Sequence, residues 1–392
     1  MSDVVIASAV RTAIGSFQGA FRTLSASDLG AVVVGEAVAR AGAQPDQVER
    51  VIMGNVLSAG MGQAPARQTV IKAGLPVSVG AITVNKMCGS GLQAVMFARR
   101  EILVGDAQVL VAGGMESMTN APYCLPKARD GFRMGHGQIL DTMILDGLWD
   151  PYSDVHMGNC GDMVAEKYGF TREAQDGFAL ESYSRARAAQ ENGKFKAEIV
   201  PVEVPQRRGD PTLVDRDEEP FRSDPARFSS LRPAFSQDGT VTAANASTIN
   251  DGAAALLVCS EARADELGFR KLARILADST AAVEPEWFTI APIKALANLF
   301  EKTGRGPQDF DLYEINEAFS GVTMAAMEEY GLDRARVNVH GGAVSLGHPI
   351  GCSGARVLVT LLHALADRDE TTGVATLCIG GGEAVAVAVE RL

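Results

Sequence analysis

Apolar and polar residues alternate in short blocks up to about residue 117, and these blocks predict strands and helices in turn. Runs of β-branched and small apolar residues predict strands at 4–9, 51–57, 79–84 and 107–112. Helical spacing predicts helices at 27–41, 64–73 and from Cys88 onward, with Gly42 and Gly74 as stop signals. This βαβ order is typical of a largely parallel sheet covered by helices.

The regular alternation is lost between about residues 117 and 250. Gly, Pro and Asp are frequent there, and the one strong predicted helix, at 171–190, ends at Asn192 and Gly193. We expect this segment to be an insertion carried by the α/β body, which is a common place for binding loops.

From residue 253 the alternation predicts a second α/β unit. Its predicted strands are 253–259, 272–279, 312–315, 374–379 and 384–389, and its predicted helices are 261–267, 293–302, 317–330 and 353–366.

Two segments of the chain repeat one pattern. Residues 88–92 (Cys-Gly-Ser-Gly-Leu) open a helix that leads to a strand ending at Gly113 and Gly114. Residues 351–355 (Gly-Cys-Ser-Gly-Ala) open a helix that leads to a strand ending in the glycines at 380–382. A chance likeness between two α/β units would explain so short a match, but the matching order of elements favours two duplicated halves.

Composition narrows the class of protein. The net charge of −12 over 392 residues disfavours non-specific binding to nucleic acid. No apolar run reaches the length of a membrane span, and the first residues lack the features of a secretory signal. The six cysteines have no CxxC spacing and the five histidines no HxxxH spacing, which argues against a zinc site and a disulfide framework. We expect a cytoplasmic protein with reduced thiols, without a metal site or a membrane partner.

Cys88 lies where a predicted strand passes into a predicted helix. A thiol at a helix N-terminus meets unpaired N–H groups and the positive end of the helix dipole, and both favour the thiolate. The sequence therefore predicts a better nucleophile than a free cysteine. A buried structural cysteine is the alternative, and this turn alone does not separate the two.

Three further residues stand at similar strand-to-helix junctions. His348 lies in a glycine-rich loop before a helix, Cys378 ends a strand before three glycines, and Asn316 follows a strand. Each has an ordinary explanation, since a lone histidine is often structural and an asparagine often caps a helix. Taken with Cys88, they suit covalent acyl transfer through a thioester.

Five motifs, in order along the chain, resemble those of the thiolase family, and specifically its acetyl-CoA acetyltransferase branch. They are Asn85-Lys86-Met87-Cys88-Gly89-Ser90-Gly91, Gly114-Met115-Glu116-Ser117-Met118, Asn316-Glu317-Ala318-Phe319, Gly347-His348-Pro349-Ile350-Gly351 and Cys378-Ile379-Gly380-Gly381-Gly382. The resemblance implies an α/β protein with two βαβαβαββ halves in a five-layered αβαβα body. It also implies an inserted loop domain for CoA, and a dimer or a homotetramer built as a dimer of dimers. The predicted division is 1–118 with 250–270, 119–249 and 271–392.

The resemblance also implies roles for individual residues. Cys88 is similar to the nucleophile that takes the acyl group, and His348 to the residue that activates it and holds the thioester oxygen. Asn316 is similar to the side chain that orients a water in this first oxyanion hole. Cys378 resembles the acid/base that acts on the α-carbon of the second acetyl-CoA. The backbone N–H groups of Cys88 and Gly380 resemble a second oxyanion hole.

The acyl and CoA contacts are likewise carried over from the family. The residues that resemble them are His156, Met157, Leu231, Phe235, Ala243, Ser247, Phe288 and Phe319. A methionine at 157 would leave room for acetyl and acetoacetyl groups and little more. Met157 and Phe288 are also explained as ordinary core residues.

Two departures from the family pattern bear on the site. Glu383 and Ala384 follow the three glycines where the family usually has Met-Gly. A carboxylate there would either raise the pKa of Cys378 or point away from it. The segment 207–227 also differs in length, which leaves the adenine-side contacts open.

The leading hypothesis is an acetyl-CoA C-acetyltransferase, which converts two acetyl-CoA to acetoacetyl-CoA and CoA, or the reverse. Its partners would be these CoA thioesters as substrates, with no separate cofactor. A degradative 3-ketoacyl-CoA thiolase of broader chain length is the nearest alternative. Cys378 argues against a β-ketoacyl synthase, which would have histidine or asparagine instead. A non-catalytic CoA- or lipid-binding relative is disfavoured because all four chemical positions are filled.

Overall fold

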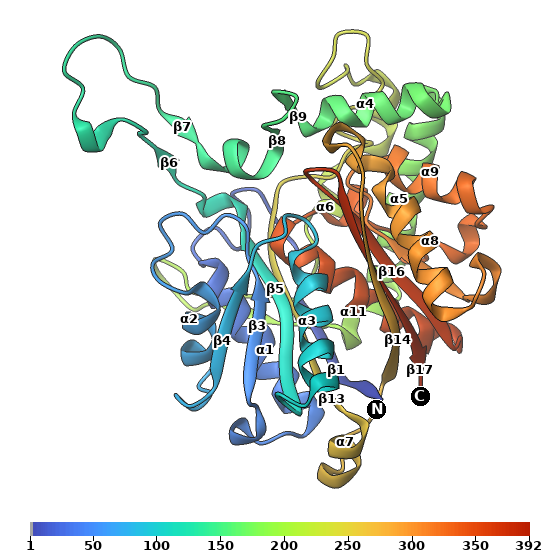
Figure 1. Ribbon diagram of the computed structural model, residues 1–392. Helices are drawn as coiled ribbons and strands as arrows, with labels where there is room; N and C mark the ends of the chain where they lie inside the picture. The colour runs from blue at the N-terminus through green and yellow to red at the C-terminus, as the bar shows by residue number, and fades with distance from the viewer. Residues whose placement is uncertain (1–2) are drawn as a thin grey trace.

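Two groups of strands run through the molecule, with helices between and outside them (Figure 1). The structure is a computed structural model that describes residues 3–392, so the first two residues of the predicted N-terminal half lie outside the described residues. The first group has the order β4-β3-β5-β13-β1 and the second the order β15-β16-β17-β14. Two residue pairs of β1 and β14, Val5 with Arg274 and Ile6 with Ala273, join the groups into one hydrogen-bonded sheet.

The two groups repeat one plan. The strands of the first group are β1 (Val4–Thr12), β3 (Arg50–Gly54), β4 (Gly80–Val84), β5 (Val109–Ser117) and β13 (Asn250–Ser260). The strands of the second group are β14 (Ala273–Ala282), β15 (Leu312–Ile315), β16 (Thr372–Ile379) and β17 (Glu383–Arg391). β1 corresponds to β14, β13 to β17, β5 to β16 and β3 to β15. A parallel bridge from Tyr313 to Val337 takes the place of β4. The duplicated halves predicted from the repeated pattern are therefore confirmed.

Three layers of helices separate and cover the strands. The helices are α1 (Ala26–Ala41) and α2 (Pro65–Lys72) on the outer face of the first group, α8 (Ala291–Thr303) and α9 (Ser320–Tyr330) on the outer face of the second, and α3 (Ser90–Val104) and α11 (Ile350–Arg368) between the groups. This is the predicted αβαβα arrangement.

The two central helices cross at glycines of the repeated motif. A Cβ built on Gly91 would lie 2.6 Å from the backbone N of Ala355, and one on Gly354 would lie 2.4 Å from the backbone N of Leu92. Any larger residue at either position would push the helices apart. The close crossing brings the N-terminal ends of α3 and α11 together, and with them the loops of Cys88 and His348.

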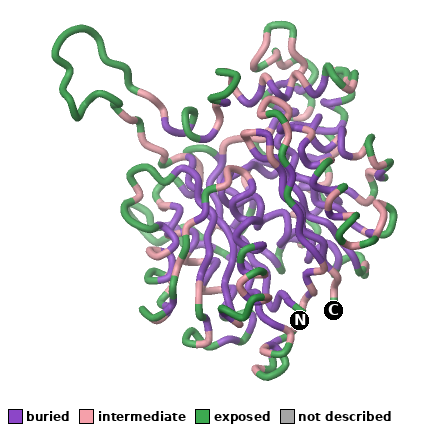
Figure 2. Tube along the Cα trace, in the orientation of Figure 1, coloured by how far each residue is buried: buried purple, intermediate pink, exposed green. Residues whose placement is uncertain are grey.

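In the described part of the chain, α11 is the one helix long and apolar enough to span a membrane. It forms the central layer instead, because 83% of its most apolar stretch is buried inside the protein. Figure 2 shows this buried core continuing through both groups of strands.

The segment between β5 and β13 contains one long helix more than the sequence predicts. Besides α5 (Arg172–Glu191), which is confirmed, it contains α4 (Met157–Tyr168), which is missed. The short strands and α-helix of this segment are β6 (Tyr123–Cys124), β7 (Leu140–Asp141), β8 (Trp149–Asp150), β9 (Val155–His156), β10 (Ile199–Val200), β11 (Val202–Val204), β12 (Thr212–Val214) and α6 (Glu219–Arg222). Three further short elements lie elsewhere in the chain: β2 (Gly15–Ser16), α7 (Glu261–Leu267) and α10 (Ala343–Leu346). The β6–β7 hairpin stands away from the body and is largely exposed (Figures 1 and 2).

A buried group of charges ties the inserted segment to the first strand. Arg11 Nε lies 2.6 Å from Glu198 Oε1, and its Nη1 lies 2.7 Å from Asp217 Oδ1, with all three side chains inaccessible to solvent. Buried charges are stable only when paired in this way. The loop segment is thus fixed to the body at residues far apart in sequence.

Candidate active site

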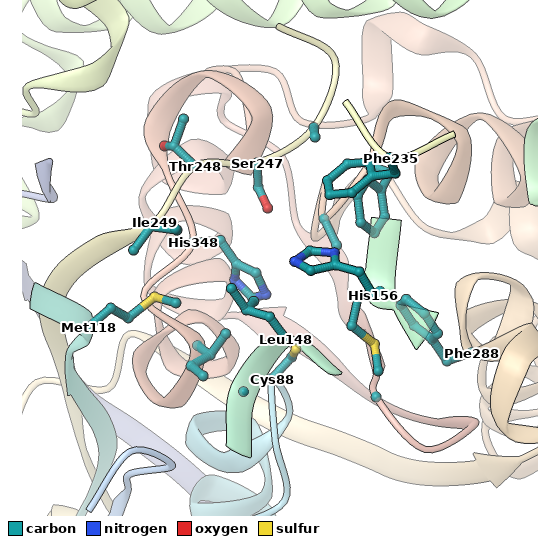
Figure 3. Close-up of a pocket in the computed structure, with 17 residues that line it drawn as sticks. Cys88, Met118, Leu148, His156, Phe235, Ser247, Thr248, Ile249, Phe288 and His348 are labelled. Atoms are coloured by element: carbon teal, nitrogen blue, oxygen red, sulfur yellow. The ribbon is translucent and has the colours of Figure 1, made fainter. Parts of the chain in front are cut away.

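A cavity of about 230 Å³ lies at the N-terminal ends of α3 and α11 (Figure 3). Nine residues predicted to form the site line it: Cys88, His156, Met157, Phe235, Ser247, Phe288, Phe319, His348 and Gly380. Asn316 and Cys378 do not line it and are fully buried. Leu231 packs against a separate cluster and Ala243 is exposed, so their role as CoA contacts stays a prediction.

The turn that carries Cys88 is held in an uncommon conformation. Met87 has a φ of 46°, in the left-handed region, and its N–H donates to Asn85 Oδ1 at 3.1 Å. Ser90 Oγ accepts from Lys86 N at 2.8 Å and donates to Met87 O at 2.6 Å. These bonds offset the strain of a non-glycine residue at positive φ. They fix the place of the Cys88 side chain at the mouth of α3.

The predicted preference of Cys88 for the thiolate is wrong. The backbone N–H groups of Cys88 and Gly380 both favour the charged sulfur, but burial outweighs them and raises the pKa of the thiol to about 11, with a further push from Glu116. Desolvation penalises the thiolate more than two N–H dipoles stabilise it. Cys88 is therefore a neutral thiol that needs a base.

His348 lines the same cavity and keeps one ring nitrogen free. Its backbone N–H donates to Asn250 Oδ1 at 2.9 Å, and its Nδ1 lies 2.6 Å from Ser353 Oγ. Nε2 is buried without a hydrogen-bond partner among residues 3–392. Burial, assisted by the charge of Arg356, lowers the pKa of His348 to about 3, so the imidazole is neutral at neutral pH. Figure 3 shows its ring and Cys88 on the same side of the cavity.

Glu116 joins the His348 loop to the loop after β3. Its carboxylate accepts from Asn55 Nδ2 at 2.9 Å and from three backbone N–H groups, those of Val56, Leu57 and Gly351, at 3.1, 3.1 and 2.8 Å. Burial raises its pKa to about 7 against the pull of these donors. These bonds also explain why the strand predicted at 51–57 ends at Gly54.

Asn316 is oriented by a buried arginine. Arg356 Nη2 lies 3.5 Å from Asn316 Oδ1, and Arg356 Nη1 lies 3.4 Å from Glu314 Oε2. An arginine only donates, so the oxygen of the amide faces it and Nδ2 is left without a partner within the described residues. The helix-cap explanation for Asn316 is wrong, because α9 begins at Ser320 and its N-cap is Phe319.

Cys378 is the second thiol of the site. It is fully buried near the end of β16 and packs with Met157, Phe288 and Phe319. Burial raises its pKa well above the ordinary value, and the neighbouring Cys88 adds to the effect. Cys378 is therefore also neutral at rest, and the two thiols lie close enough to influence each other.

Of the two outcomes expected for Glu383, the structure supports the second. Its Oε2 lies 2.7 Å from Lys86 Nζ, so the carboxylate pairs with the Cys88 loop. Glu383 is not among the causes of the pKa shift at Cys378.

His156 and its neighbours close the far end of the cavity. His156 caps α4, since its Nδ1 accepts from Gly158 N at 3.1 Å, and its ring stacks on Phe235 at a centroid distance of 4.7 Å. A Cβ on Gly158 would lie 2.2 Å from Phe235 Cδ2, so glycine is required there. Met157 is buried beside Gly380, and a Cβ on Gly380 would lie 3.5 Å from the methionine sulfur.

Eight further residues line the cavity but carry no predicted role: Met118, Gly147, Leu148, Ala246, Thr248, Ile249, Ala318 and Ile350. Most stand within or next to a motif that the sequence already marks. Gly147 and Leu148 are in a stretch with no recognisable pattern, so only the folded chain brings them to the site.

The described residues contain no group of three or more His, Cys, Asp or Glu side chains arranged to hold a metal ion. All six cysteines, each within the described residues, are free thiols.

The fold and the site together define the class: a duplicated α/β protein whose cavity is lined by a cysteine and a neutral histidine, with a second cysteine buried behind its wall. The family model described as "Thiolase, N-terminal domain" matches residues 4–262, and the one described as "Thiolase, C-terminal domain" matches residues 269–391. The chain belongs to the thiolase family.

Relatives and solved structures agree with this assignment. The chain is 54% identical to an acetyl-CoA acetyltransferase of Cupriavidus necator and 52% identical to one of Pseudomonas aeruginosa, each compared over 100% of both chains. The crystal structure of the Bacillus anthracis acetyl-CoA acetyltransferase matches with a TM-score of 0.98 and 42% identity, over 100% of this chain and 99% of that one. The Acat5 thiolase from Ascaris suum, solved in complex with coenzyme A, matches with a TM-score of 0.95 and 44% identity over 100% of both chains.

Proposed function

We propose that the protein is an acetyl-CoA C-acetyltransferase that joins two acetyl-CoA into acetoacetyl-CoA and CoA, and catalyses the reverse thiolysis. One observation carries the proposal: Cys88, the free Nε2 of His348 and the N–H of Gly380 meet at one small cavity. Full-length relatives named acetyl-CoA acetyltransferase support the same activity.

The first half-reaction acylates Cys88. His348 Nε2 takes the proton from the Cys88 thiol as the sulfur attacks the carbonyl carbon of acetyl-CoA. The protonated Nε2 then donates to the thioester oxygen, and Asn316 supports the same oxygen through a water. The bond from that carbon to the CoA sulfur breaks, which leaves an acetyl group on Cys88 and a CoA thiolate.

Because its pKa is raised, the Cys378 thiol carries a proton at rest and is a source of the proton that the departing CoA thiolate needs. A buried neutral thiol acts as a base only after it has given up its own proton, and the departing CoA thiolate is the group that needs one. We therefore infer that Cys378 protonates CoA and becomes a thiolate opposite the imidazolium of His348.

The second half-reaction forms the carbon–carbon bond. The Cys378 thiolate removes a proton from the α-carbon of a second acetyl-CoA, and His348 holds the enolate oxygen. The enolate attacks the acetyl group on Cys88, whose oxygen is held by the N–H groups of Cys88 and Gly380. The Cys88 sulfur leaves and recovers its proton from His348, so each group returns to its starting state.

The small cavity supports a short acyl group. Its volume of about 230 Å³ lies below the ~300–1,000 Å³ typical of sites for larger ligands. Met157 and Phe288, buried at its wall, limit the space further. Both features favour acetyl and acetoacetyl groups over the longer chains of a degradative thiolase.

Several other expectations remain part of this proposal. We propose that residues 119–249 form the loop domain. The N-terminal half of the body would be 1–118 with 250–270, and the C-terminal half 271–392. We also propose that Leu231 and Ala243 contact CoA outside the cavity.

A homotetramer is supported by the edge strand β4, whose Ile82 is 42% exposed, and by apolar residues on the protruding β6–β7 hairpin. The proposed chemistry needs only thiols, an imidazole and N–H groups, so no cofactor enters it. Free thiols suit a cytoplasmic location.

Steady-state thiolysis over a series of 3-ketoacyl-CoA chain lengths tests the proposal. We expect the highest kcat/KM with acetoacetyl-CoA and a steep fall with longer chains. Activity that rises towards medium-chain substrates would favour the degradative thiolase instead.

A further inference from the structure

The hydroxyl of Ser353 lies between the catalytic imidazole and a backbone carbonyl. Its Oγ is 2.6 Å from His348 Nδ1 and 2.9 Å from Pro349 O, and the side chain is buried in the first turn of α11. A serine hydroxyl has one proton, so it donates to only one of these neighbours.

Two arrangements of protons are available. In the first, His348 carries its proton on Nδ1 and donates to Ser353 Oγ, while the hydroxyl donates to Pro349 O. In the second, the hydroxyl donates to Nδ1 and the imidazole proton is on Nε2. The first makes two hydrogen bonds and the second makes one, and both leave Nε2 without a partner. A carbonyl only accepts, so it cannot supply the missing bond in the second arrangement.

We propose that Ser353 is a positioning residue that fixes the tautomer of His348, with the proton on Nδ1 and the lone pair on Nε2 facing Cys88. The inference rests on the proposed function, because it concerns how the same histidine begins acyl transfer. The second tautomer would present an N–H to the thiol and could not take its proton.

The burial of His348 makes the tautomer decisive. The ring is neutral at neutral pH because burial, with the nearby charge of Arg356, strongly disfavours the imidazolium. The state of the resting site therefore depends on which nitrogen carries the single proton. Nothing else in contact with Nδ1 competes with Ser353 among the hydrogen bonds of the described residues.

The same bond serves both half-reactions. When Nε2 takes the proton of Cys88, Nδ1–H still donates to Ser353, so the ring does not need to turn. The new Nε2–H then points at the place where the thioester or enolate oxygen forms. Ser353 thus holds one ring orientation for a base and, later, for a donor.

Nitrogen NMR of ¹⁵N-histidine-labelled enzyme without substrate tests the inference directly at neutral pH. The signals of His348 are assigned by their loss in the His348→Asn variant. We expect Nδ1 to show the shift of a protonated ring nitrogen and Nε2 that of an unprotonated one. A protonated Nε2 with an unprotonated Nδ1 would overturn the proposal.

The Ser353→Ala variant supplies a second readout. We expect its His348 to populate the Nε2–H tautomer, and single-turnover acetylation of Cys88 to slow about tenfold, as for the loss of one hydrogen bond, with little change in KM. Thr360→Val is the matched control, because Thr360 is a buried hydroxyl on the same helix that bonds Glu198 instead. It should leave the tautomer and the acetylation rate unchanged.

An unchanged tautomer and rate in Ser353→Ala would contradict the positioning role. If Ser353→Ala fails to fold, the wild-type spectrum still decides the question. Failure of the proposed function has a different signature: Cys88 would carry no acetyl group, whichever tautomer the spectrum shows.

Discussion

Lys86 Nζ and Glu383 Oε2 lie 2.7 Å apart and join the loop before Cys88 to the strand after Cys378. The pair connects the two halves of the body across 297 positions of sequence. Each half supplies one N–H, that of Cys88 or that of Gly380, to the same sulfur. The ion pair therefore links the segments that carry the two N–H groups of the proposed second oxyanion hole.

We expect Glu383→Gln to slow condensation by at most about fivefold, because the pair is partly exposed and such pairs contribute ~0.2–1 kcal/mol. The rate difference from wild type should shrink at high salt, which screens the pair. Lys72→Met is the control, since it breaks an ion pair of similar exposure, with Asp28, far from the cavity. An equal loss in Lys72→Met would show that the effect is not specific to the two loops.

The alkylation of Cys88 by iodoacetamide should rise with pH and show no plateau near neutrality. The pKa of the Cys88 thiol is about 11, and the pKa of His348 is about 3, so the two do not form a thiolate–imidazolium ion pair at neutral pH. The thiolate fraction therefore grows throughout the range of about pH 6 to 10. Background labelling is measured in Cys88→Ala. A rate that levels off below pH 7 would contradict a neutral thiol–imidazole pair.

Glu116→Gln should destabilise the fold and change its pH dependence. The Gln amide NH₂ would face backbone donors that now bond a carboxylate oxygen, which costs roughly 1–3 kcal/mol. The pKa of Glu116 is about 7 in the folded state, against an ordinary value of 4.5 for a glutamate, so the folded state holds more protons between these values. Its contribution to wild-type stability is present below pH 4.5 and is lost as pH rises through about 7.

Urea unfolding of wild type and Glu116→Gln at several pH values measures this contribution. The advantage of wild type should shrink by on the order of 3 kcal/mol between the two pKa values. An advantage that grows with pH would mean that the backbone donors, and not burial, set the pKa.

Met157→Ala should widen the range of substrates. Removing the side chain enlarges the cavity beside Gly380, so kcat/KM for longer 3-ketoacyl-CoA should rise relative to acetoacetyl-CoA. We expect a change of about tenfold, because each methylene that a pocket accommodates contributes roughly 1–3 kcal/mol. Met163→Ala is the matched control, since Met163 lies on the same helix but does not line the cavity. Unchanged selectivity in Met157→Ala would remove Met157 as the limit on chain length.

Much of the fold was predictable because local pattern and topology agree. The strand at Leu312–Ile315 and the helix at Glu261–Leu267 match their predicted bounds, since turn and cap residues delimit them. Helix α4 was missed because two glycines in its first turns weaken the helical pattern, and the stacking of its cap residue His156 on Phe235 is a tertiary contact. Helix α1 begins at Ala26 and not at the predicted residue 27, because Ser25 is its cap.

The motif residues of the site were also predictable, but their chemical states were not. The helix-dipole argument for Cys88 considers only its own helix, whereas burial in the folded chain decides its pKa. Glu116 and the Lys86–Glu383 pair act through partners brought near by the fold, so no local pattern marks their contacts. The spacing of the motifs identifies which residues lie in the site, and burial then sets the protonation state of each.

Mass analysis of the enzyme after brief incubation with acetyl-CoA and an acid quench identifies the residue that carries the acyl group. We expect one acetyl group, on the peptide of Cys88, together with released CoA. Cys378→Ala should acquire the same acetyl group and form no acetoacetyl-CoA, and Cys88→Ala should acquire none. An acetyl group on another residue, or acetoacetyl-CoA formed by Cys88→Ala, would contradict Cys88 as the nucleophile.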